Sequence, residues 1–171
     1  MIYFNSHKRP ATLEEIERFE KVIGVRLPED YREYLASGGG GASTRGEYAF
    51  KMTKPGILEN DDVGGEALLE YLLSAAASDG EESDLMASYK YMNSPDREFN
   101  YLPQDMIVIG EAPGGSYVLL GIKGDRRGKV YFWDSNLFPL EDFGPETYEN
   151  ISYVADSFSE FLSSLYPFGD S

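Results

Sequence analysis

Three strand-like runs follow one another in the second half of the chain, over residues 106–109, 117–122 and 129–133, with glycine-rich turns between them. Each run is short and apolar and contains β-branched or aromatic side chains, which is typical of strands. Sequential runs with short connections favour an antiparallel meander. This meander restricts the possible folds, because helices must then pack around the sheet and cannot alternate with its strands.

The N-terminal residues carry the signals of two helices. Thr12 and Glu15 have the spacing of a capping box, in which the hydroxyl and the carboxylate each satisfy a free backbone donor. Apolar residues then recur at three- and four-residue spacing until Gly24, which ends the pattern. Pro28 suits the first turn of a second helix, and the glycine cluster 38–41 should end it.

The remaining segments predict one more strand and further helices. Residues 48–52 alternate as a strand does, whereas the apolar residues over 68–76 recur on one side of a predicted helix. The segment 85–99 is compatible with a short helix that Pro95 must end. A second capping box, over 157–160, opens the last helix. The chain is therefore predicted to be α+β, with a central, mainly antiparallel sheet flanked by N-terminal helices and a C-terminal helix.

The length of the chain, 171 residues, fits one domain that buries roughly 70% of the surface of its unfolded state. The N-terminus lacks the basic start and long apolar run of an export signal, and no apolar stretch approaches the length of a membrane span. We therefore expect a single cytoplasmic domain over residues 1–171.

The charge of the chain is negative and unevenly distributed. The net charge is −15; residues 1–58 hold 9 basic and 8 acidic side chains, whereas residues 59–171 hold 6 and 22. No basic residue follows Lys129. Such a surface repels nucleic-acid phosphates and anionic lipid head groups and attracts basic partners. Negative charge can serve solubility alone, but the asymmetry favours binding of a protein with a basic surface, and neither nucleic acid nor a membrane.

The residue inventory argues against an enzyme. The chain has no cysteine and one histidine, His7, so a thiol nucleophile and a thiolate zinc site are excluded. The glycine-rich segment 37–41 follows a helix and 124–128 joins two strands, so neither has the context of a phosphate-binding loop. The acidic clusters 59–62 and 79–84 lack the alternating ligands and glycine of an EF-hand. We predict no catalysis, no cofactor and no metal site. A hydrolase stays open only if a cleft holds a buried carboxylate pair with a raised pKa.

Several short strings occur together in a characteristic order: LEEI (13–16), LPEDYREYL (27–35), YVLL (117–120), GKVYFWD (128–134) and VADSFSEFL (154–162). This ordered set resembles the SUKH superfamily, which includes a yeast cell-wall regulator and many bacterial immunity proteins. The resemblance covers residues 12–41 and 106–166, so residues 1–11 are expected to be an N-terminal extension and 77–100 a variable insertion. Ser37 and the glycines after it depart from the asparagine and glycine pair that family members commonly carry there.

The resemblance implies a single SUKH-like α+β domain without known catalysis. Bacterial members are often antidotes that bind a co-encoded toxin, frequently a nuclease. A nuclease must present positive charge to phosphates, so an acidic inhibitor can be steered onto its active surface. The leading hypothesis is therefore an immunity protein that neutralises a cognate toxin with a basic surface. The alternative is a non-catalytic regulatory or scaffold module of the same fold, involved in cell-wall or signalling regulation.

The candidate contact residues come from the acidic loops and from one aromatic strand. Tyr131, Phe132 and Trp133 alternate along a strand and cannot all face one core, and tyrosine and tryptophan are enriched at interfaces. Clustered carboxylates in the loops would attract a basic partner, although such clusters are more often simply solvated. The predicted partner-binding residues are Glu59, Asp61, Asp62, Asp79, Glu81, Glu82, Asp84, Tyr131, Trp133 and Asp134.

Overall fold

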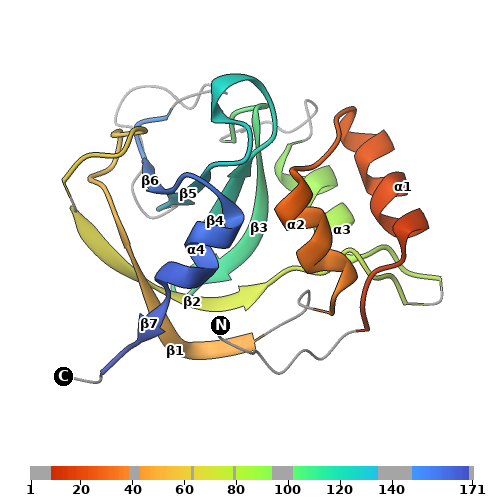
Figure 1. Cartoon of the computed structure of the whole chain (residues 1–171), viewed down its shortest axis with the longest axis horizontal. Helices are drawn as coiled ribbons and strands as arrows, with labels where there is room; N and C mark the ends of the chain where they lie inside the picture. Colours follow the sequence, from red (N-terminus) through yellow and green to blue (C-terminus); the bar gives the residue numbers. More distant parts are fainter. Residues whose placement is uncertain are drawn as a thin grey trace.

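The computed structural model describes residues 9–38, 43–62, 64–78, 80–93, 102–134 and 148–169 (Figure 1). Its elements are, in order, α1 (Leu13–Ile23), α2 (Glu29–Ala36), β1 (Ser43–Met52), β2 (Gly65–Leu72), α3 (Asp84–Met92), β3 (Met106–Ala112), β4 (Ser116–Gly121), the short 3-10 helix η1 (Gly124–Arg126), β5 (Val130–Trp133), β6 (Ile151–Ala155), α4 (Phe158–Ser164) and β7 (Tyr166–Pro167). The predicted α+β class is confirmed.

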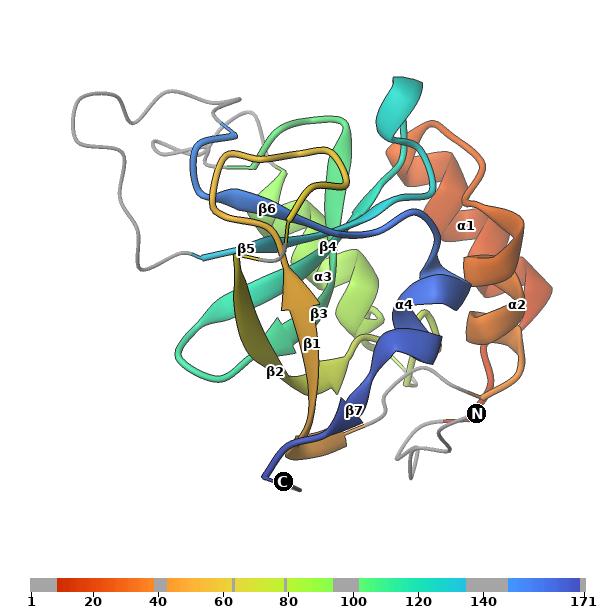
Figure 2. The same ribbon diagram turned by 60° about the vertical axis from the view of Figure 1, so that its left-hand side comes forward.

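The strands form one seven-stranded sheet in the order β6-β5-β4-β3-β2-β1-β7, and all neighbours are antiparallel. The predicted meander is present as β3, β4 and β5. The sheet is strongly curled (Figure 2), and the segment after β1 reaches β6. There the backbone N–H of Thr53 donates to the carbonyl of Tyr153 at 3.0 Å, and Gly56 donates to Ile151 at 2.8 Å. These bonds join the two ends of the sheet.

The helix predicted over 68–76 is wrong, because residues Gly65–Leu72 form strand β2. Leu68 pairs with Ala49 of β1, and Tyr71 pairs with Glu111 of β3. The run contains good helix formers, but pairing with strands on both sides supplies backbone hydrogen bonds and burial that outweigh a weak local preference.

The helices at the two ends of the chain pack together against the curled sheet. Helix α2 contacts both α1 and α4, and Figure 1 shows it between them. Phe161 of α4 meets Phe50 of β1 edge to face, with ring centroids 5.4 Å apart, and Phe158 meets Tyr31 of α2 at 4.9 Å. Such pairs add about 1 kcal/mol each to the burial of the rings.

Both predicted capping-box sequences lie at helix starts, but only the one at α1 forms in full, because the Glu160 carboxylate of α4 accepts the Asp156 N–H at 3.2 Å and not that of the N-cap residue. Thr12 Oγ1 accepts the Glu15 backbone N–H at 3.2 Å, and Glu15 returns the contact to the Thr12 N–H at 3.0 Å. Gly24 ends α1 with a φ of 80°, and Ser157 caps α4 by accepting the Glu160 N–H. No helix in these described ranges has the length and apolar character needed to cross a membrane.

Candidate functional site

A row of paired side chains crosses the middle of the sheet. Tyr71 of β2 pairs with Glu111 of β3, Glu111 pairs with Tyr117 of β4, and Tyr117 pairs with Trp133 of β5. Directly paired residues of antiparallel strands point to the same face of a sheet. The row therefore places a carboxylate between two tyrosines on one face.

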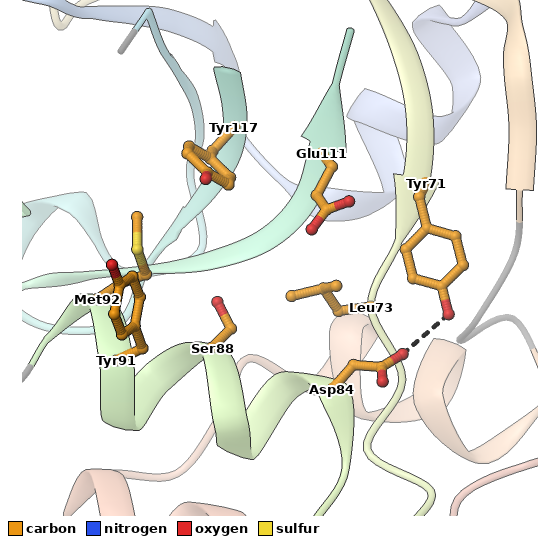
Figure 3. A pocket seen from close by; sticks show the side chains of 8 residues that line it. All are labelled: Tyr71, Leu73, Asp84, Ser88, Tyr91, Met92, Glu111 and Tyr117. Carbon is orange, nitrogen blue, oxygen red and sulfur yellow. Dashed lines mark hydrogen bonds between the residues drawn. The ribbon is translucent and has the colours of Figure 1, made fainter. Parts of the chain in front are cut away.

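Helix α3 packs against β3, and an open pocket with a volume of about 570 Å³ lies between the helix and this face of the sheet. Figure 3 shows side chains of β2, β3 and β4 on one side of the pocket and side chains of α3 on the other. The lining residues are Tyr71, Leu73, Asp84, Ser88, Tyr91, Met92, Glu111 and Tyr117. None of these residues is basic, and the two that can carry charge, Asp84 and Glu111, are carboxylates.

The segment between β2 and α3 determines where the helix lies. Ser83 caps α3 by accepting the Met86 N–H at 3.1 Å. The Leu73 N–H donates to the Ile109 carbonyl of β3 at 2.9 Å, and the Leu85 N–H donates to the Ser74 carbonyl at 3.1 Å. Leu85, Met86 and Met92 are buried; of these three, only Met92 also lines the pocket, together with Asp84, Ser88 and Tyr91 of the same helix.

A second contact ties the same segment to helix α1. The Ala77 N–H donates to Glu15 Oε2 at 2.7 Å, and Arg9 Nη2 donates to the Ala77 carbonyl at 3.0 Å. Arg9 also pairs with both carboxylate oxygens of Glu15, at 2.6 and 2.9 Å. We call Arg9, Glu15 and Ala77 the α1 clamp, because it fixes the chain that leads into α3.

The carboxylates in and around the pocket disfavour one another's ionised form. Partial burial raises the pKa of the Glu111 carboxyl above its usual value, and the nearby Glu70 and Asp84 carboxylates raise it further. Within the described residues, no arginine or lysine forms an ion pair with Glu111. The Tyr71 hydroxyl donates to Asp84 Oδ2 at 2.9 Å. Burial is the larger cause of the raised pKa of Tyr71, and this hydrogen bond is the second. A cation would relieve the repulsion among the carboxylates.

Three of the predicted contact residues lie in or beside the pocket. Asp84 lines it directly. Trp133 is 7% exposed and stacks obliquely on Tyr117, with ring centroids 5.5 Å apart, so it supports one wall. Asp134 accepts a hydrogen bond from Ser116, the neighbour of Tyr117, at 3.4 Å.

The other predicted contact residues lie elsewhere. Tyr131 is fully buried beside Tyr153; both faces of β5 are covered, so this side chain has a place in the core and none on an interface. Glu59, Asp61 and Asp62 are exposed in the connection between β1 and β2 and do not line the pocket. The exposed Glu81 and Glu82 precede α3, and Glu82 pairs with Lys90. Asp79 lies outside the described residues.

No pattern in the sequence selects Glu111, Tyr117, Tyr71 or Tyr91 as site residues. Their grouping depends on strand register and on the packing of α3, and Tyr71 fell in a segment interpreted as helix. Alternation along β3 and β4 was the only available signal, and it assigns residues to faces without showing which residues on different strands are paired. In the described part of the chain, no group of three or more histidine, aspartate or glutamate side chains could hold a metal ion.

Comparison with known proteins gives one family and one relative. The model of the SMI1 / KNR4 family (SUKH-1) matches residues 10–164, which span every element from α1 to α4. The SPbeta prophage-derived uncharacterized protein YokK of Bacillus subtilis (strain 168) is similar, with 30% identity over 160 residues that cover 90% of this chain and 74% of the relative. All the residues that line the pocket lie within the family match.

Proposed function

The chain belongs to the SMI1 / KNR4 family (SUKH-1), and from this membership we propose that it is a non-catalytic immunity protein that neutralises a cognate toxin by direct protein–protein contact. The superfamily includes bacterial immunity proteins. The observation that carries the proposal for this chain is the acidic pocket, which opens in a protein of net charge −15. A basic protein surface complements both features.

The distribution of charge supports a basic partner. Long-range attraction between opposite charges accelerates encounter and orients the partners, and added salt screens it. A toxin that acts on nucleic acid presents positive charge to phosphates. An inhibitor with excess carboxylates on its surface can occupy that region in place of the substrate.

The pocket does not offer the machinery of a hydrolase. That alternative called for a buried carboxylate pair, whereas Glu111 keeps contact with solvent despite its partial burial, and Asp84 is half-buried with one oxygen accepting the Tyr71 hydroxyl. A general acid with a strongly raised pKa needs a desolvated site that excludes water. Binding without catalysis accounts for this arrangement better.

The proposal is tested by growth rescue. The toxin domain encoded beside this gene is expressed from an inducible promoter, with and without this protein, and viable colonies are counted. An immunity protein restores viability, and the purified pair forms a complex that weakens as the salt concentration rises. Full toxicity despite verified expression, together with no complex at low salt, overturns the proposal. A complex without rescue would favour the regulatory or scaffold module.

A further inference from the structure

We propose that the pocket between α3 and the sheet receives an arginine side chain of the protein partner. The inference deepens the proposed function and rests on it for the identity of the partner. Its basis is the combination of cavity, charge and aromatic lining in one place, and nothing in the family assignment specifies it.

The dimensions of the pocket suit one long side chain. Its volume of about 570 Å³ lies in the range of small-ligand sites, which is roughly 300–1,000 Å³. Leu73 and Met92 supply apolar lining, and Leu73 lies between the carboxylates of Glu111 on β3 and Asp84 on α3 (Figure 3). An arginine can lay its aliphatic stem along this apolar lining while its guanidinium group meets the carboxylates.

The charge of the pocket is complementary to a cation. Glu111 has no ion-pair partner among the described residues, and Glu70 and Asp84 oppose its ionisation. A guanidinium group placed between Glu111 and Asp84 would turn this repulsion into attraction. It could donate to both carboxylates at once, because its five N–H donors form a planar fork.

The aromatic lining selects arginine over lysine. Tyr91 is 64% exposed on α3, and Tyr117 faces the same space from β4, where Trp133 supports it. A planar guanidinium stacks on tyrosine rings, whereas the compact ammonium group of lysine is more strongly hydrated. Tyrosine and arginine are also among the residues enriched at interface hot spots.

Among its described residues, the chain already contains this chemistry within its own fold. The guanidinium of Arg126 lies over the Tyr148 ring, 4.5 Å from its centroid, and donates to Asp105 at 3.2 Å. The Tyr148 hydroxyl donates to the same Asp105 carboxylate at 3.0 Å. In the pocket, Tyr71 donates to Asp84 in the same way. The intramolecular site shows the tyrosine and carboxylate arrangement occupied by an arginine.

The direct test uses a blocked tripeptide with a central arginine and matched peptides with lysine or citrulline, the neutral analogue of arginine. Binding to the full-length, 15N-labelled protein at low salt is followed by NMR. We expect chemical-shift changes concentrated at residues 84–92, 111 and 117, and a dissociation constant on the order of millimolar for so small a ligand. Lysine should bind more weakly and citrulline should not bind. Shifts spread over the acidic surface, or equal binding of citrulline, would overturn the proposal.

Variants locate the binding site. Glu111→Gln should weaken the arginine peptide at least about fivefold, and Tyr91→Ala, at an exposed helix position, should narrow the preference for arginine over lysine. Glu17→Gln removes the same charge from an exposed position on α1 and should leave binding unchanged. Thermal unfolding confirms that each variant is folded. Equal effects of Glu111→Gln and Glu17→Gln would show that net charge, and no pocket, accounts for binding.

The toxin experiment separates this inference from the proposed function. Glu111→Gln should weaken the toxin complex about tenfold or more relative to Glu17→Gln. Rescue by the wild type with unchanged toxin affinity of Glu111→Gln refutes the arginine pocket and leaves the immunity function standing. If the wild type fails to rescue growth but binds the arginine peptide at residues 84–92 and 111, the immunity function is refuted and the arginine site is retained.

Discussion

Replacing Glu15 with glutamine should destabilise the domain and release the chain that carries one wall of the pocket. The Glu15 carboxylate accepts the Thr12 N–H at 3.0 Å, the Ala77 N–H at 2.7 Å and two donors of Arg9. Its side chain is 10% exposed, whereas that of Arg9 is 52% exposed. Glutamine keeps the size and one acceptor oxygen but removes the charge, so the α1 clamp loses its ion pair.

The magnitude follows from the pKa of Glu15. The Arg9 guanidinium, opposed by partial burial and assisted by the Ala77 and Thr12 N–H groups, lowers this pKa from 4.5 to about 2. A shift of this size corresponds to at most ~3 kcal/mol at neutral pH. Because Arg9 is half exposed, solvent screening reduces the expected loss to about 1–2 kcal/mol. A lowered pKa stabilises the fold above the ordinary value of 4.5, and this contribution is lost as the pH falls toward 2.

The assay is urea unfolding of wild type and Glu15→Gln near pH 7 and near pH 3, with Glu17→Gln as the control for a charge lost from the same helix. The difference between wild type and Glu15→Gln should shrink to roughly half or less near pH 3, while the control should stay within about 0.5 kcal/mol of wild type. Hydrogen exchange at residues 77–86 should also accelerate in Glu15→Gln. A difference that is equal at both pH values would refute the role of the ionised carboxylate.

Further variants test the pocket and the sheet. Burial and neighbouring carboxylates raise the pKa of Glu111, so ionisation of this carboxyl lowers the stability of the fold as the pH rises through its raised pKa. Glu111→Gln should therefore be more stable than wild type near pH 7 and lose this advantage near pH 4. A Glu111→Gln variant less stable than wild type near pH 7 would contradict the reasoning. Tyr71→Phe removes the donor to Asp84 and should cost about 1 kcal/mol in urea unfolding; an unchanged midpoint would mean that the bond contributes nothing. Gly121→Ala would place a Cβ against the Arg126 carbonyl and should lower stability by about 3 kcal/mol, whereas a melting temperature equal to wild type would show that the turn after β4 can move.

The parts of the fold that depend on local signals could be predicted from the sequence. Thr12 and Glu15 specify a helix start through contacts three residues apart, and Gly24 specifies its end. The meander β3 to β5 follows from short connections, which leave few ways to join the runs. By contrast, β2 was interpreted as a helix, since its apolar residues fit either period. Its pairing with β1 and β3 depends on residues distant in the sequence.

The position of the candidate site could be predicted only in part. Three of the residues selected from the sequence, Asp84, Trp133 and Asp134, lie at or beside the pocket, whereas the basic partner that the charge asymmetry indicates stays a prediction. Glu111 could not be selected, because its significance arises from the tyrosines paired with it on both sides. A cluster of carboxylates along the sequence, such as 59–62, can be recognised without a structure. A cluster of side chains that the pairing register of the strands brings together cannot.

The pocket combines two walls with different structural constraints. Tyr71, Glu111 and Tyr117 stand on central strands, where a change of register would disturb the core. The opposite wall comes from α3, inside the segment 77–100 that the sequence predicts to be a variable insertion. Ser88 and Tyr91 of this helix line the pocket, whereas the buried Leu85 and Met86 dock the helix on the core. Substitutions on the outer face of α3 can therefore change which side chain the pocket accepts. The sheet meanwhile keeps Glu111, the carboxylate that meets the charged end of that side chain.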